Sequence, residues 1–389
     1  MARKVCVLTS VHPAFDVRIF HKECKSLARA GYDVTLIAPA SEDSDHGGLA
    51  VKALPAWSSR FDRFRQGSLA VYNIALKVDA DIYHFHDPEL IPIALLLRLH
   101  GKKVIYDIHE DLPGTISYKS YIPRPLRGLV SKAVEFIEDA ASSRFSALLA
   151  ATPAIEKRFR RAHKNVAVLN NYPRIEEIEC PAEPSHRKRE ASLLYVGMRI
   201  TRARGAEEMV RSMGLLPPEL HASLKLVGNW DTLELPASLA RIPGWNRVTF
   251  VGPLGRTEVA GELRKAYAGL VILHPEPNYV ASQPVKLFEY MCAGIPVIAS
   301  DFPVCREIVD QARCGILVDP RNPEEIANAI QFLLTHPEEA EEMGRRGFQA
   351  IVQRYNWANE ERTLLRFYSE LFPREDAYRK RLVDRGQTA

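Results

Sequence analysis

The segment SQPVKLFEYMCAGIPVIAS, residues 282–300, has the pattern of a short helix that leads into a buried strand. Ser282 or Gln283 can cap the helix, and Pro284 is a favoured residue at its first position. Gly294 suits the end of a helix, and the apolar run after it is typical of a buried strand. The segment therefore predicts one helix–strand step of an α/β fold.

The predicted helix, about residues 284–293, carries Lys286 and Glu289 on one face. Its first turn offers free N–H groups and the positive end of the helix dipole to an anion, and Lys286 adds a full charge. Glu289 can accept hydrogen bonds from neutral hydroxyls, as an acidic residue does with ribose in dinucleotide folds. Spacing alone leaves open a solvated Lys–Glu pair worth at most ~0.5 kcal/mol. The face expected to pack on the sheet consists of Val285, Phe288 and Cys292.

Short apolar runs alternate with helical stretches throughout the chain. Strands that are apolar on both faces and alternate with helices indicate a parallel sheet covered on two sides. The stretch 176–192, rich in proline and charge, interrupts the pattern and is typical of a linker. The runs before the linker are 4–10, 32–39, 80–88, 102–110, 146–153 and 165–171, and those after it are 192–198, 224–229, 248–254, 270–276, 295–300 and 314–320.

The two series of runs predict two doubly wound α/β domains, one over residues 1–185 and one over residues 186–371. Open parallel sheets bind ligands at the carboxyl ends of their strands, so we expect a cleft between two facing domains. Residues 323–389 are expected to be helical. The last helix, about 372–389, is polar enough to lie across a surface, and we expect that surface to be the first domain.

The composition indicates a globular protein with a weak charge bias. The chain has 389 residues, of which 46% are hydrophobic and 26% are charged, and its formal net charge is +4. A mildly basic protein suits anionic ligands or an anionic lipid surface, but this charge does not imply nucleic acid. The six cysteines form no CxxC pair and mostly have apolar neighbours, as reduced thiols of a cytosolic protein do.

The sequence is expected to be that of a cytoplasmic protein without a signal peptide. Its longest apolar stretch, residues 90–99, is interrupted by Pro92 and Arg98 and is shorter than the roughly 20 residues that a bilayer requires. Two stretches, 56–78 and 118–134, mix aromatic and basic residues, and helices of this kind can rest on anionic lipid. Peripheral contact of the first domain with the inner face of the membrane is one interpretation, and the lining of an ordinary cleft is the other.

Five motifs follow one another along the chain and carry most of its polar residues at strand ends. They are FHKECKSLARAGYDVTLIAP (20–39), HFHDPEL (84–90), YDIHEDLP (106–113), YVGMRITRARGAEEMV (195–210) and PVKLFEYMCAGIPVIASDFPVCREIV (284–309). In this order they resemble the motifs of glycosyltransferase family 4, a family of retaining enzymes with the GT-B fold. That fold consists of two facing Rossmann-like domains, which agrees with the two series of strands.

The resemblance implies that Glu289 binds the ribose hydroxyls of a nucleotide and that Lys286 lies near its diphosphate. The family commonly has a further glutamate eight residues before Glu289, where this chain has Ala281. The contacts of that carboxylate must come from elsewhere, and candidates are the backbone amides of residues 279–283 and the side chain of Asn278. Further donor contacts implied by the resemblance are Ser282, Gln283, Pro284 and Val285.

The loop GMRITRARG, residues 197–205, resembles the glycine-bearing loop with which the family clamps the diphosphate of its donor. Gly197 matches the glycine, and Arg199 and Arg204 match the basic positions. Arginines near strand-to-helix turns can bind phosphate bidentately and neutralise a leaving group with about two negative charges. A solvated basic turn is the alternative, and Arg202 is expected to be solvated.

His109 follows a predicted buried strand and matches the family histidine that lies against the transferred sugar. Its implied role is to hydrogen-bond the sugar and orient it, with Glu110 or Asp111 near the acceptor. A structural histidine is the alternative reading of a single histidine at a strand end.

Two other groups of polar residues at strand ends are left open. After the first strand, many family members have a Gly-Gly pair, and this chain instead has polar residues that could contact the donor or the acceptor. In HFHDPEL the structural reading is favoured, with Asp87 and Glu89 as a helix cap. The residues concerned are His12, Asp16, Arg18 and His21 in the first group and His84, His86 and Asp87 in the second.

No metal and no cofactor besides the donor substrate is expected. Two D-x-D stretches, 43–45 and 79–81, lie in a polar loop and ahead of a strand, so neither is aimed at the expected cleft. The chain has no GxGxxG after a strand and no P-loop, HExxH or GxSxG motif. Dehydrogenase, P-loop, zincin and esterase chemistry are therefore not expected.

The resemblance implies a metal-independent, retaining glycosyltransferase that moves a hexose from a UDP- or GDP-type sugar to a hydroxyl of a glycan or lipid-linked acceptor, in bacterial cell-surface polysaccharide or glycolipid synthesis. In the family's mechanism the departing phosphate takes the acceptor proton on the same face of the sugar. Catalysis is then mostly positioning and charge stabilisation by Arg199, Arg204 and Lys286. The alternatives are a sugar-nucleotide 2-epimerase of the same fold and a non-catalytic partner subunit that binds nucleotide sugars.

Overall fold

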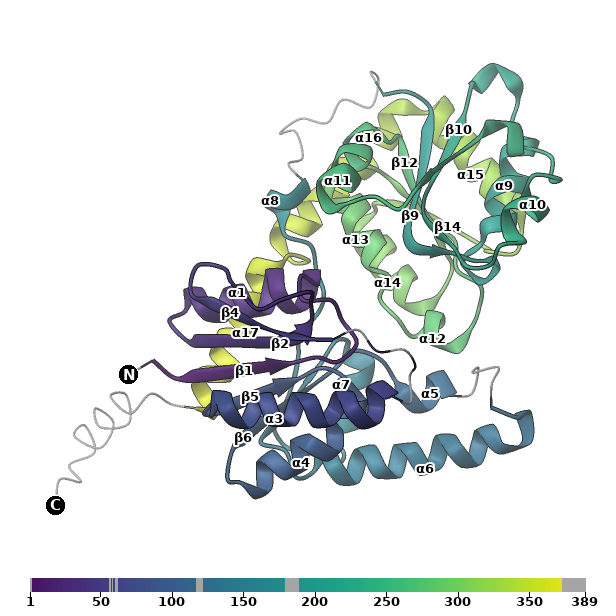
Figure 1. Cartoon of the computed structure of the whole chain (residues 1–389). Helices are drawn as coiled ribbons and strands as arrows, with labels where there is room; N and C mark the ends of the chain where they lie inside the picture. The colour runs from purple at the N-terminus through teal and green to yellow at the C-terminus, as the bar shows by residue number, and fades with distance from the viewer. Residues whose placement is uncertain are drawn as a thin grey trace. The chain divides into compact units, whose positions relative to one another are not determined.

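The chain forms two compact units of similar design, each a mainly parallel sheet flanked by helices (Figure 1). Unit 1 comprises residues 1–171 and 358–389, and unit 2 comprises residues 172–357. This arrangement confirms the predicted pair of Rossmann-like α/β domains. The computed structural model describes residues 2–55, 57, 59, 62–116, 122–178 and 189–372.

Unit 1 is built on an eight-stranded sheet in the order β3-β4-β2-β1-β5-β6-β7-β8, in which only the β3–β4 pair is antiparallel among the described strands. All six apolar runs predicted before the linker form strands. The sequence pattern missed β3 and β4, which lie at the sheet edge and mix polar with apolar residues. The strands are β1 Lys4–Leu8, β2 Asp33–Pro39, β3 Ser44–Asp45, β4 Leu49–Leu54, β5 Ile82–Phe85, β6 Lys103–Ile108, β7 Ala147–Ala150 and β8 Val166–Val168.

The helices of unit 1 cover both faces of this sheet. Helices α3, α4 and α6 follow one face, where they enclose an apolar core that includes Tyr83 and Phe85. The helices are the π-helix η1 Val17–Cys24, α1 Lys25–Arg29, η2 Arg63–Gly67, α3 Ser68–Val78, η3 Pro88–Leu90, α4 Ile91–Leu99, α5 Leu112–Ile116, α6 Arg124–Ser142, α7 Pro153–Phe159 and α17 Trp357–Leu371.

The division of the chain differs from the expected boundaries of 1–185 and 186–371. Unit 1 ends at Asn171, and the chain returns to it at Ala358, so most of α17 belongs to the first unit. Glu360 on α17 accepts the backbone N–H of Asn170 at 2.7 Å, and the Tyr368 hydroxyl lies 2.8 Å from Nδ1 of His84. We expected residues 372–389 to pack on the first domain, and α17 makes this contact instead. Residues 373–389 lie outside the described residues.

Unit 2 is built on a six-stranded parallel sheet in the order β11-β10-β9-β12-β13-β14. Every apolar run predicted after the linker overlaps one of these strands, although the run 270–276 shares only its first two residues with β12. The strands are β9 Ser192–Ile200, β10 Ser223–Trp230, β11 Val248–Gly252, β12 Ala268–Val271, β13 Val297–Ser300 and β14 Gly315–Val318.

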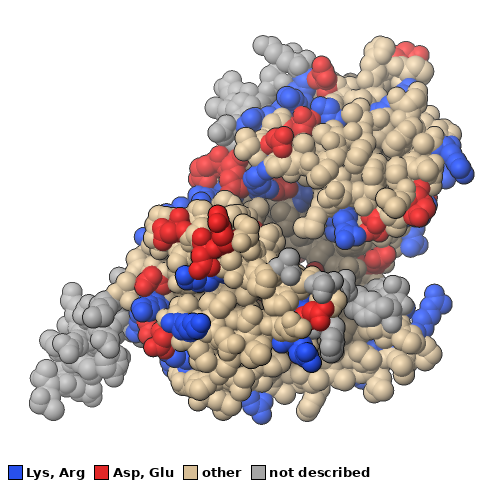
Figure 2. All heavy atoms as spheres, in the orientation of Figure 1, with Lys and Arg blue, Asp and Glu red and all other residues tan. Residues whose placement is uncertain are grey.

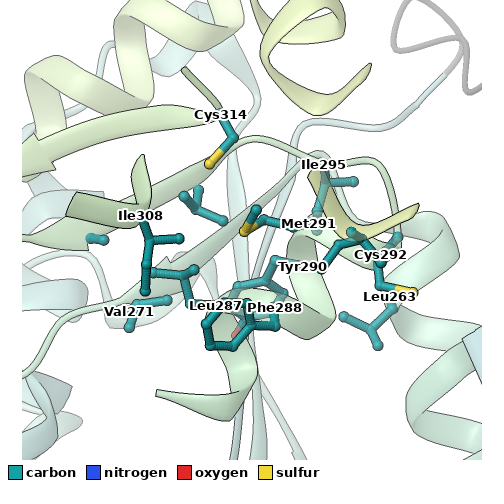
Figure 3. Close-up of a cluster of buried hydrophobic side chains, with 14 of the residues drawn as sticks. Leu263, Val271, Leu287, Phe288, Tyr290, Met291, Cys292, Ile295, Ile308 and Cys314 are labelled. Atoms are coloured by element: carbon teal, nitrogen blue, oxygen red, sulfur yellow. The ribbon is translucent and has the colours of Figure 1, made fainter. Parts of the chain in front are cut away.

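The core of unit 2 holds the helix of the opening segment, α13 Val285–Cys292 (Figure 3). Its residues 287–292 are all buried, so its position is fixed by packing. The other helices are α8 Ile175–Ile178, η5 Arg202–Arg204, α9 Ala206–Leu215, η6 Pro218–Leu220, α10 Leu235–Leu239, η7 Trp245–Arg247, α11 Arg256–Lys265, α12 Pro277–Val280, α14 Pro303–Ala312, α15 Pro323–Thr335 and α16 Pro337–Gln353.

The surface charge agrees with the weak charge bias of the composition, and the cysteines agree with the expected buried thiols. On the face that Figure 2 shows, acidic and basic side chains are interspersed, so this face carries no continuous basic stripe among the described residues. Within the same residues no helix has both the length and the hydropathy of a membrane-crossing segment. Cys180 lies outside the described residues, and the other cysteines are buried and form no disulfide with one another: Cys6, Cys24, Cys292, Cys305 and Cys314.

Candidate functional site

The amino terminus of α13 has no side-chain cap. Pro284 occupies the N-cap position, and the hydroxyl of Ser282 donates to the carbonyl of Tyr279 at 3.2 Å, so the expected cap by Ser282 or Gln283 is wrong. The first N–H groups of a helix have no partner within it, and here no side chain of a described residue takes them. They remain able to bind an anion. Val285 is 36% exposed at this end of the helix and does not join the buried face that we expected of it.

Lys286 places a buried ammonium group next to this helix end. Its Nζ is buried and has no hydrogen-bond acceptor among the described residues, and it lies 3.6 Å from the centre of the Tyr195 ring. Burial, reinforced by the charge of Arg204, lowers the pKa of Lys286 well below its usual value despite the opposing charge of Glu289. A buried cation without a paired anion is unfavourable, so an anionic ligand beside Lys286 would relieve that cost.

Arg204 lies on the other side of Tyr195. Its Nε donates to the Tyr279 hydroxyl at 3.3 Å. Burial alone would lower the pKa of Arg204, but the hydroxyls of Tyr279 and Tyr195 outweigh burial and raise this pKa above its usual value. The described structure gives the guanidinium no carboxylate partner. Gly205, at φ +70°, begins α9 directly after it, and a Cβ there would lie 2.4 Å from Ile272. The tight turn therefore requires glycine and fixes the backbone that carries Arg204.

Arg199 is at the end of β9 and is 62% exposed, with its guanidinium 2.9 Å from Asp231. The Tyr195 hydroxyl donates to the carbonyl of Arg199 at 2.8 Å. Gly197 makes this hydrogen bond possible, because a Cβ at that position would lie 2.8 Å from the same hydroxyl. Tyr195 thus connects the three predicted cations of the site, although sequence reasoning did not identify it.

A pocket of about 470 Å³ lies over this loop in unit 2. Its lining includes the three arginines of the loop as well as Asp231 and Tyr279; the arginines are Arg199, Arg202 and Arg204. Arg202 is 59% exposed and is paired with Glu207, which agrees with the expected solvated role. A pocket of this size and charge can hold a phosphorylated ligand.

Glu289 is buried and has a partner that the sequence did not reveal. Its carboxylate is 2.5 Å from the guanidinium of Arg256, which also binds Glu177 at 2.9 Å. Arg256 begins α11 directly after a glycine that follows β11. Arg256 follows the carboxyl end of a parallel strand, as the arginines of the loop after β9 do. This shared position was the sequence signal that could have indicated Arg256 as a site residue. Asn278, one candidate for the contacts expected of a carboxylate at position 281, lies on the short helix α12.

His109 follows β6 in unit 1, with 20% of its side chain exposed. Its Nε2 is 3.1 Å from Nδ1 of His86, which is buried on the neighbouring strand end, and the tautomers decide which ring donates. Burial lowers the pKa of His86 well below its usual value, so this ring is neutral. The structure thus holds His109 from behind while one edge remains accessible. Asp111, the other acid of this motif, is paired with Arg158 at 3.1 Å.

Arg18, one of the residues left open in the first loop, has structural partners in unit 1. It is buried in unit 1, where it binds both oxygens of Asp107 at 2.9 Å and lies 2.9 Å from Glu23. Burial would raise the pKa of Asp107, but Arg18 holds it well below its usual value. Burial and the Asp107 carboxylate raise the pKa of Glu23 well above its usual value, so Glu23 holds a proton.

The other open residues of unit 1 also have structural partners. Asp16 accepts the backbone N–H of Arg18 at 2.8 Å and caps η1. Asp87 does not cap η3, because its side chain accepts the Thr9 hydroxyl at 2.7 Å. His12 lies 3.5 Å from Asp87, with its ring 5.4 Å from that of His109.

The acidic stretches considered as metal motifs are occupied by other contacts. Asp43 is paired with Lys52 at 2.8 Å, and Asp79 is paired with Lys102. Among the described residues, four buried side chains have donor atoms within 4.8 Å of one another, as a metal site requires. The guanidinium of Arg18 already bonds to both carboxylates of that group, so a cation is present without a metal. The four residues are Glu23, His84, His86 and Asp107.

The two units match models of one family of enzymes. A model described as "Glycosyltransferase Family 4" matches residues 17–171, and a model described as "Glycosyl transferases group 1" matches residues 177–350. Among relatives, an uncharacterized glycosyltransferase from Methanocaldococcus jannaschii is 27% identical over 44% of this chain and 42% of its own length. Glycogen synthase from Mycobacterium tuberculosis is 23% identical over 71% of this chain and 66% of its own length. The chain thus spans about half to two thirds of these relatives.

Solved structures share the fold. Sucrose-phosphate synthase from Thermosynechococcus elongatus has a TM-score of 0.78 and 21% identity, over 96% of this chain and 99% of its own. HepE from Anabaena, solved in complex with UDP-glucose, has a TM-score of 0.71 and 15% identity, over 95% of this chain and 100% of its own. With one unit matched by each family model and the whole chain matched in fold, the chain belongs to glycosyltransferase family 4 and has the GT-B fold.

Proposed function

We propose that this glycosyltransferase transfers a hexose from a nucleoside diphosphate sugar of the UDP or GDP type to a hydroxyl acceptor, with retention at the anomeric carbon. The observation that supports the donor class is the pair of cations in unit 2. Among the described residues, the buried Lys286 ammonium has no acceptor and the Arg204 guanidinium is paired with tyrosine hydroxyls and no carboxylate, and the first amides of α13 belong to the same helix end as Lys286. A diphosphate would supply the missing negative charge.

These groups would also lower the barrier of the reaction. When the sugar–oxygen bond breaks, negative charge increases on the diphosphate, and preorganised cations stabilise that charge more in the transition state than in the ground state. The departing phosphate oxygen then takes the proton of the attacking hydroxyl on the same face of the sugar. Because Arg199, Arg204 and Lys286 supply the positive charge, we propose that transfer needs no metal ion.

Glu289 is the proposed partner of the ribose hydroxyls. In the free enzyme its carboxylate is bound to Arg256, so a nucleotide must share or replace that ion pair. Arg256 also has Glu177 as a partner, so it can turn toward Glu177 without losing all of its ionic contacts. Ser282, Gln283, Pro284 and Val285 precede or begin α13, where a donor would lie against its free amides.

His109 is the proposed contact of the transferred sugar in unit 1, where its accessible edge can form a hydrogen bond. For the pathway, we propose cell-surface polysaccharide or glycolipid synthesis in the cytoplasm, at the inner face of the membrane. The buried cysteines of the described residues, which form no disulfide with one another, fit a reducing compartment. HepE, a neighbour in fold, binds UDP-glucose, which agrees with a nucleotide-sugar donor.

A thermal-shift screen of the full chain with UDP-, GDP- and ADP-sugars tests the donor class. A donor present at 100 times its dissociation constant should add ~2.7 kcal/mol to the stability of the fold that binds it. We expect stabilisation by one nucleotide class, with no added divalent metal, and its loss in Lys286→Met. Slow hydrolysis of that donor distinguishes a transferase from a non-catalytic partner subunit, and interconversion to the 2-epimer without an acceptor would indicate an epimerase. Stabilisation by none of the donors contradicts the proposal.

A further inference from the structure

Helix α6 of unit 1 packs on the rest of the unit mainly with polar side chains. Glu138 accepts the Tyr106 hydroxyl at 3.0 Å and lies 2.8 Å from Arg158, and the Ser131 hydroxyl donates to the carbonyl of Pro113 at 2.9 Å. The buried residues of the helix are Glu138, Ala141 and Ser142. This is the reverse of an ordinary surface helix, which buries its apolar side and exposes its polar side.

The apolar side of α6 is turned to the outside. Four large side chains on it are well exposed: Leu126 at 50%, Leu129 at 70%, Phe136 at 75% and Ile137 at 60%. With Ala133 they stand at intervals of three, four, three and one residues, which places them on one side of an α-helix. We call these five residues the α6 stripe. Contiguous exposed apolar surface of this kind marks an interaction site in a folded protein.

The helices beside α6 extend the exposed apolar surface. Helix α4 packs against both α3 and α6, and the three lie side by side in Figure 1. Leu99, on α4, is 84% exposed, and Leu69, on α3, is 58% exposed. In Figure 2 the part of unit 1 where these helices lie shows mostly uncharged atoms with a few basic groups. An occupant of this surface therefore contacts a broad area as well as the stripe.

The charges next to the α6 stripe favour an anionic occupant. Lys132 is exposed on the flank of the stripe, whereas the exposed Arg124 and Glu135, which carry opposite charges, lie on the other side of the helix. Glu138 and Asp139 in the second half are both bound to Arg158, which takes up much of their charge. An apolar helix face with a basic residue beside it suits an element that lies in the headgroup region of a membrane.

A second copy of the chain fits this surface less well. Lys132 stands beside the middle of the stripe, between Leu126 and Ile137. In an antiparallel two-fold pairing through the stripe, Lys132 would approach its own copy, and like charges at such a contact oppose binding. An anionic lipid surface meets Lys132 with the opposite charge.

We propose that the α6 stripe binds a lipid bilayer that contains anionic lipids, with Leu129 and Phe136 inserted at the boundary of headgroups and acyl chains. The proposal names the membrane-binding element of unit 1 and does not depend on which sugar or acceptor the enzyme uses. It also narrows the lipid contact from the two stretches that the sequence suggested to the exposed side of α6, whose first half lies in the second stretch, 118–134. Of those stretches, residues 56, 58, 60–61 and 118–121 lie outside the described residues.

Co-sedimentation of the full chain with vesicles tests the proposal. We compare vesicles of phosphatidylcholine with vesicles of phosphatidylcholine and phosphatidylglycerol, and the chain as it is with the double variant Leu129→Gln/Phe136→Gln. The matched control is Leu215→Gln/Val352→Gln, which changes two similarly exposed apolar residues on helices of unit 2. Circular dichroism and nucleotide binding check that each variant is folded.

We expect binding to the anionic vesicles that falls more than tenfold in Leu129→Gln/Phe136→Gln and is unchanged in the control. Lys132→Gln should weaken binding by about fivefold on anionic vesicles only, since one basic residue near an anionic surface is worth ~1 kcal/mol. In Phe136→Trp, the added fluorescence should be quenched by brominated lipid, which reports the depth of this position directly.

Three results would overturn the proposal. One is equal binding of the stripe variant and the control to anionic vesicles. Another is absence of quenching in Phe136→Trp with vesicles that bind the protein. The third is a dimer of the unchanged chain that dissociates in Leu129→Gln/Phe136→Gln while vesicle binding is absent, because this would assign the α6 stripe to self-association.

Discussion

In unit 1 the buried guanidinium of Arg18 lies between two carboxyl groups, whereas in unit 2 the buried ammonium of Lys286 lies beside a second cation, Arg204. The first cluster is balanced in charge, because one cation meets one carboxylate and one protonated acid, although both oxygens of Glu23 lack a hydrogen-bond partner among the described residues. In the second cluster, no described carboxylate is bonded to the Lys286 ammonium, and Glu289 offsets its charge only in part. A buried charge that has its partner holds the fold together, and one that lacks a partner weakens the fold until a ligand supplies it. Substitution of Arg18 should therefore lower the stability of the fold, whereas substitution of Lys286 should leave it unchanged or raise it.

The largest expected effect is on stability in unit 1. Replacing Arg18 by Met leaves the Asp107 carboxylate buried without a counter-ion, and removing one partner of a buried ion pair typically costs about 3–5 kcal/mol. Urea unfolding followed by circular dichroism measures this loss. Arg29→Met is the control, because Arg29 is 51% exposed and its ion pair with Glu361 should contribute less than ~1 kcal/mol. Equal losses in the two variants would mean that the unit 1 cluster does not stabilise the fold.

Lys286→Met should do the reverse. We expect unchanged or higher stability without ligand, because a desolvated cation is removed, together with about a hundredfold weaker binding of the nucleoside diphosphate, since a hydrogen bond to a charged group contributes about 1.5–3 kcal/mol. Calorimetric titration measures the affinity. Lys265→Met, which changes a lysine of the same unit that is 72% exposed, should leave both properties unchanged. If Lys286→Met destabilised the free enzyme and bound nucleotide normally, the lysine would be structural.

The stability gained in Lys286→Met should depend on pH. Below the lowered pKa of Lys286, both the folded and the unfolded chain carry its proton, and the full cost of burying the charge is present. Between that pKa and 10.5, the folded chain releases the proton while the unfolded chain keeps it, so the unchanged enzyme gains stability as the pH rises.

The difference in unfolding free energy between Lys286→Met and the unchanged enzyme should therefore narrow with rising pH, by at most about 1.4 kcal/mol per pH unit within that window. Denaturant unfolding at a series of pH values measures it. A difference that is constant up to pH 10.5 would show that the lysine has an ordinary pKa.

A smaller effect is expected from Glu289. In Glu289→Gln we expect about fivefold weaker binding of the nucleoside diphosphate, which corresponds to about one hydrogen bond. The 2′-deoxy nucleotide should lose affinity with the unchanged enzyme but little more with the variant, because the two changes remove the same contact. If the losses were additive, Glu289 would not bind the ribose. Titration of both nucleotides against both proteins completes the cycle.

The smallest effect is expected from Arg202. It lines the same pocket as Arg199 and Arg204 but is 59% exposed and paired with Glu207. Arg202→Ala should change nucleotide affinity by less than twofold, because exposed ion pairs contribute little. A tenfold loss would bring Arg202 into the cation site and change the account of which arginines bind the ligand.

The sequence predicted the fold and most of unit 2's candidate site because both depend on local patterns. The strands that follow apolar runs, and the helix that begins after Pro284, are set by residues close in sequence. Tyr195 and Arg256 were missed because their roles depend on contacts with residues more than thirty positions away, such as Glu289 with Arg256 and Lys286 with Tyr195.

Unit 1 was harder to predict for the same reason. Arg18 reads as a polar loop residue, and only the arrangement of η1, β5 and β6 shows that it is buried against Asp107. The apolar side of α6 would be expected to pack on the sheet, and only the buried contacts of Glu138 reveal that the helix is turned the other way.

The most direct test of the incomplete cation site is a titration of Lys286 by NMR, with the lysine side chains labelled with ¹³C and the signal assigned through Lys286→Met. Without ligand, the signal of Lys286 should titrate well below 10.5, and saturation with the nucleoside diphosphate should raise its pKa. A Lys286 that titrates near 10.5 in the free enzyme, or whose pKa is unchanged by the nucleotide, would contradict the presence of an anion site at this position.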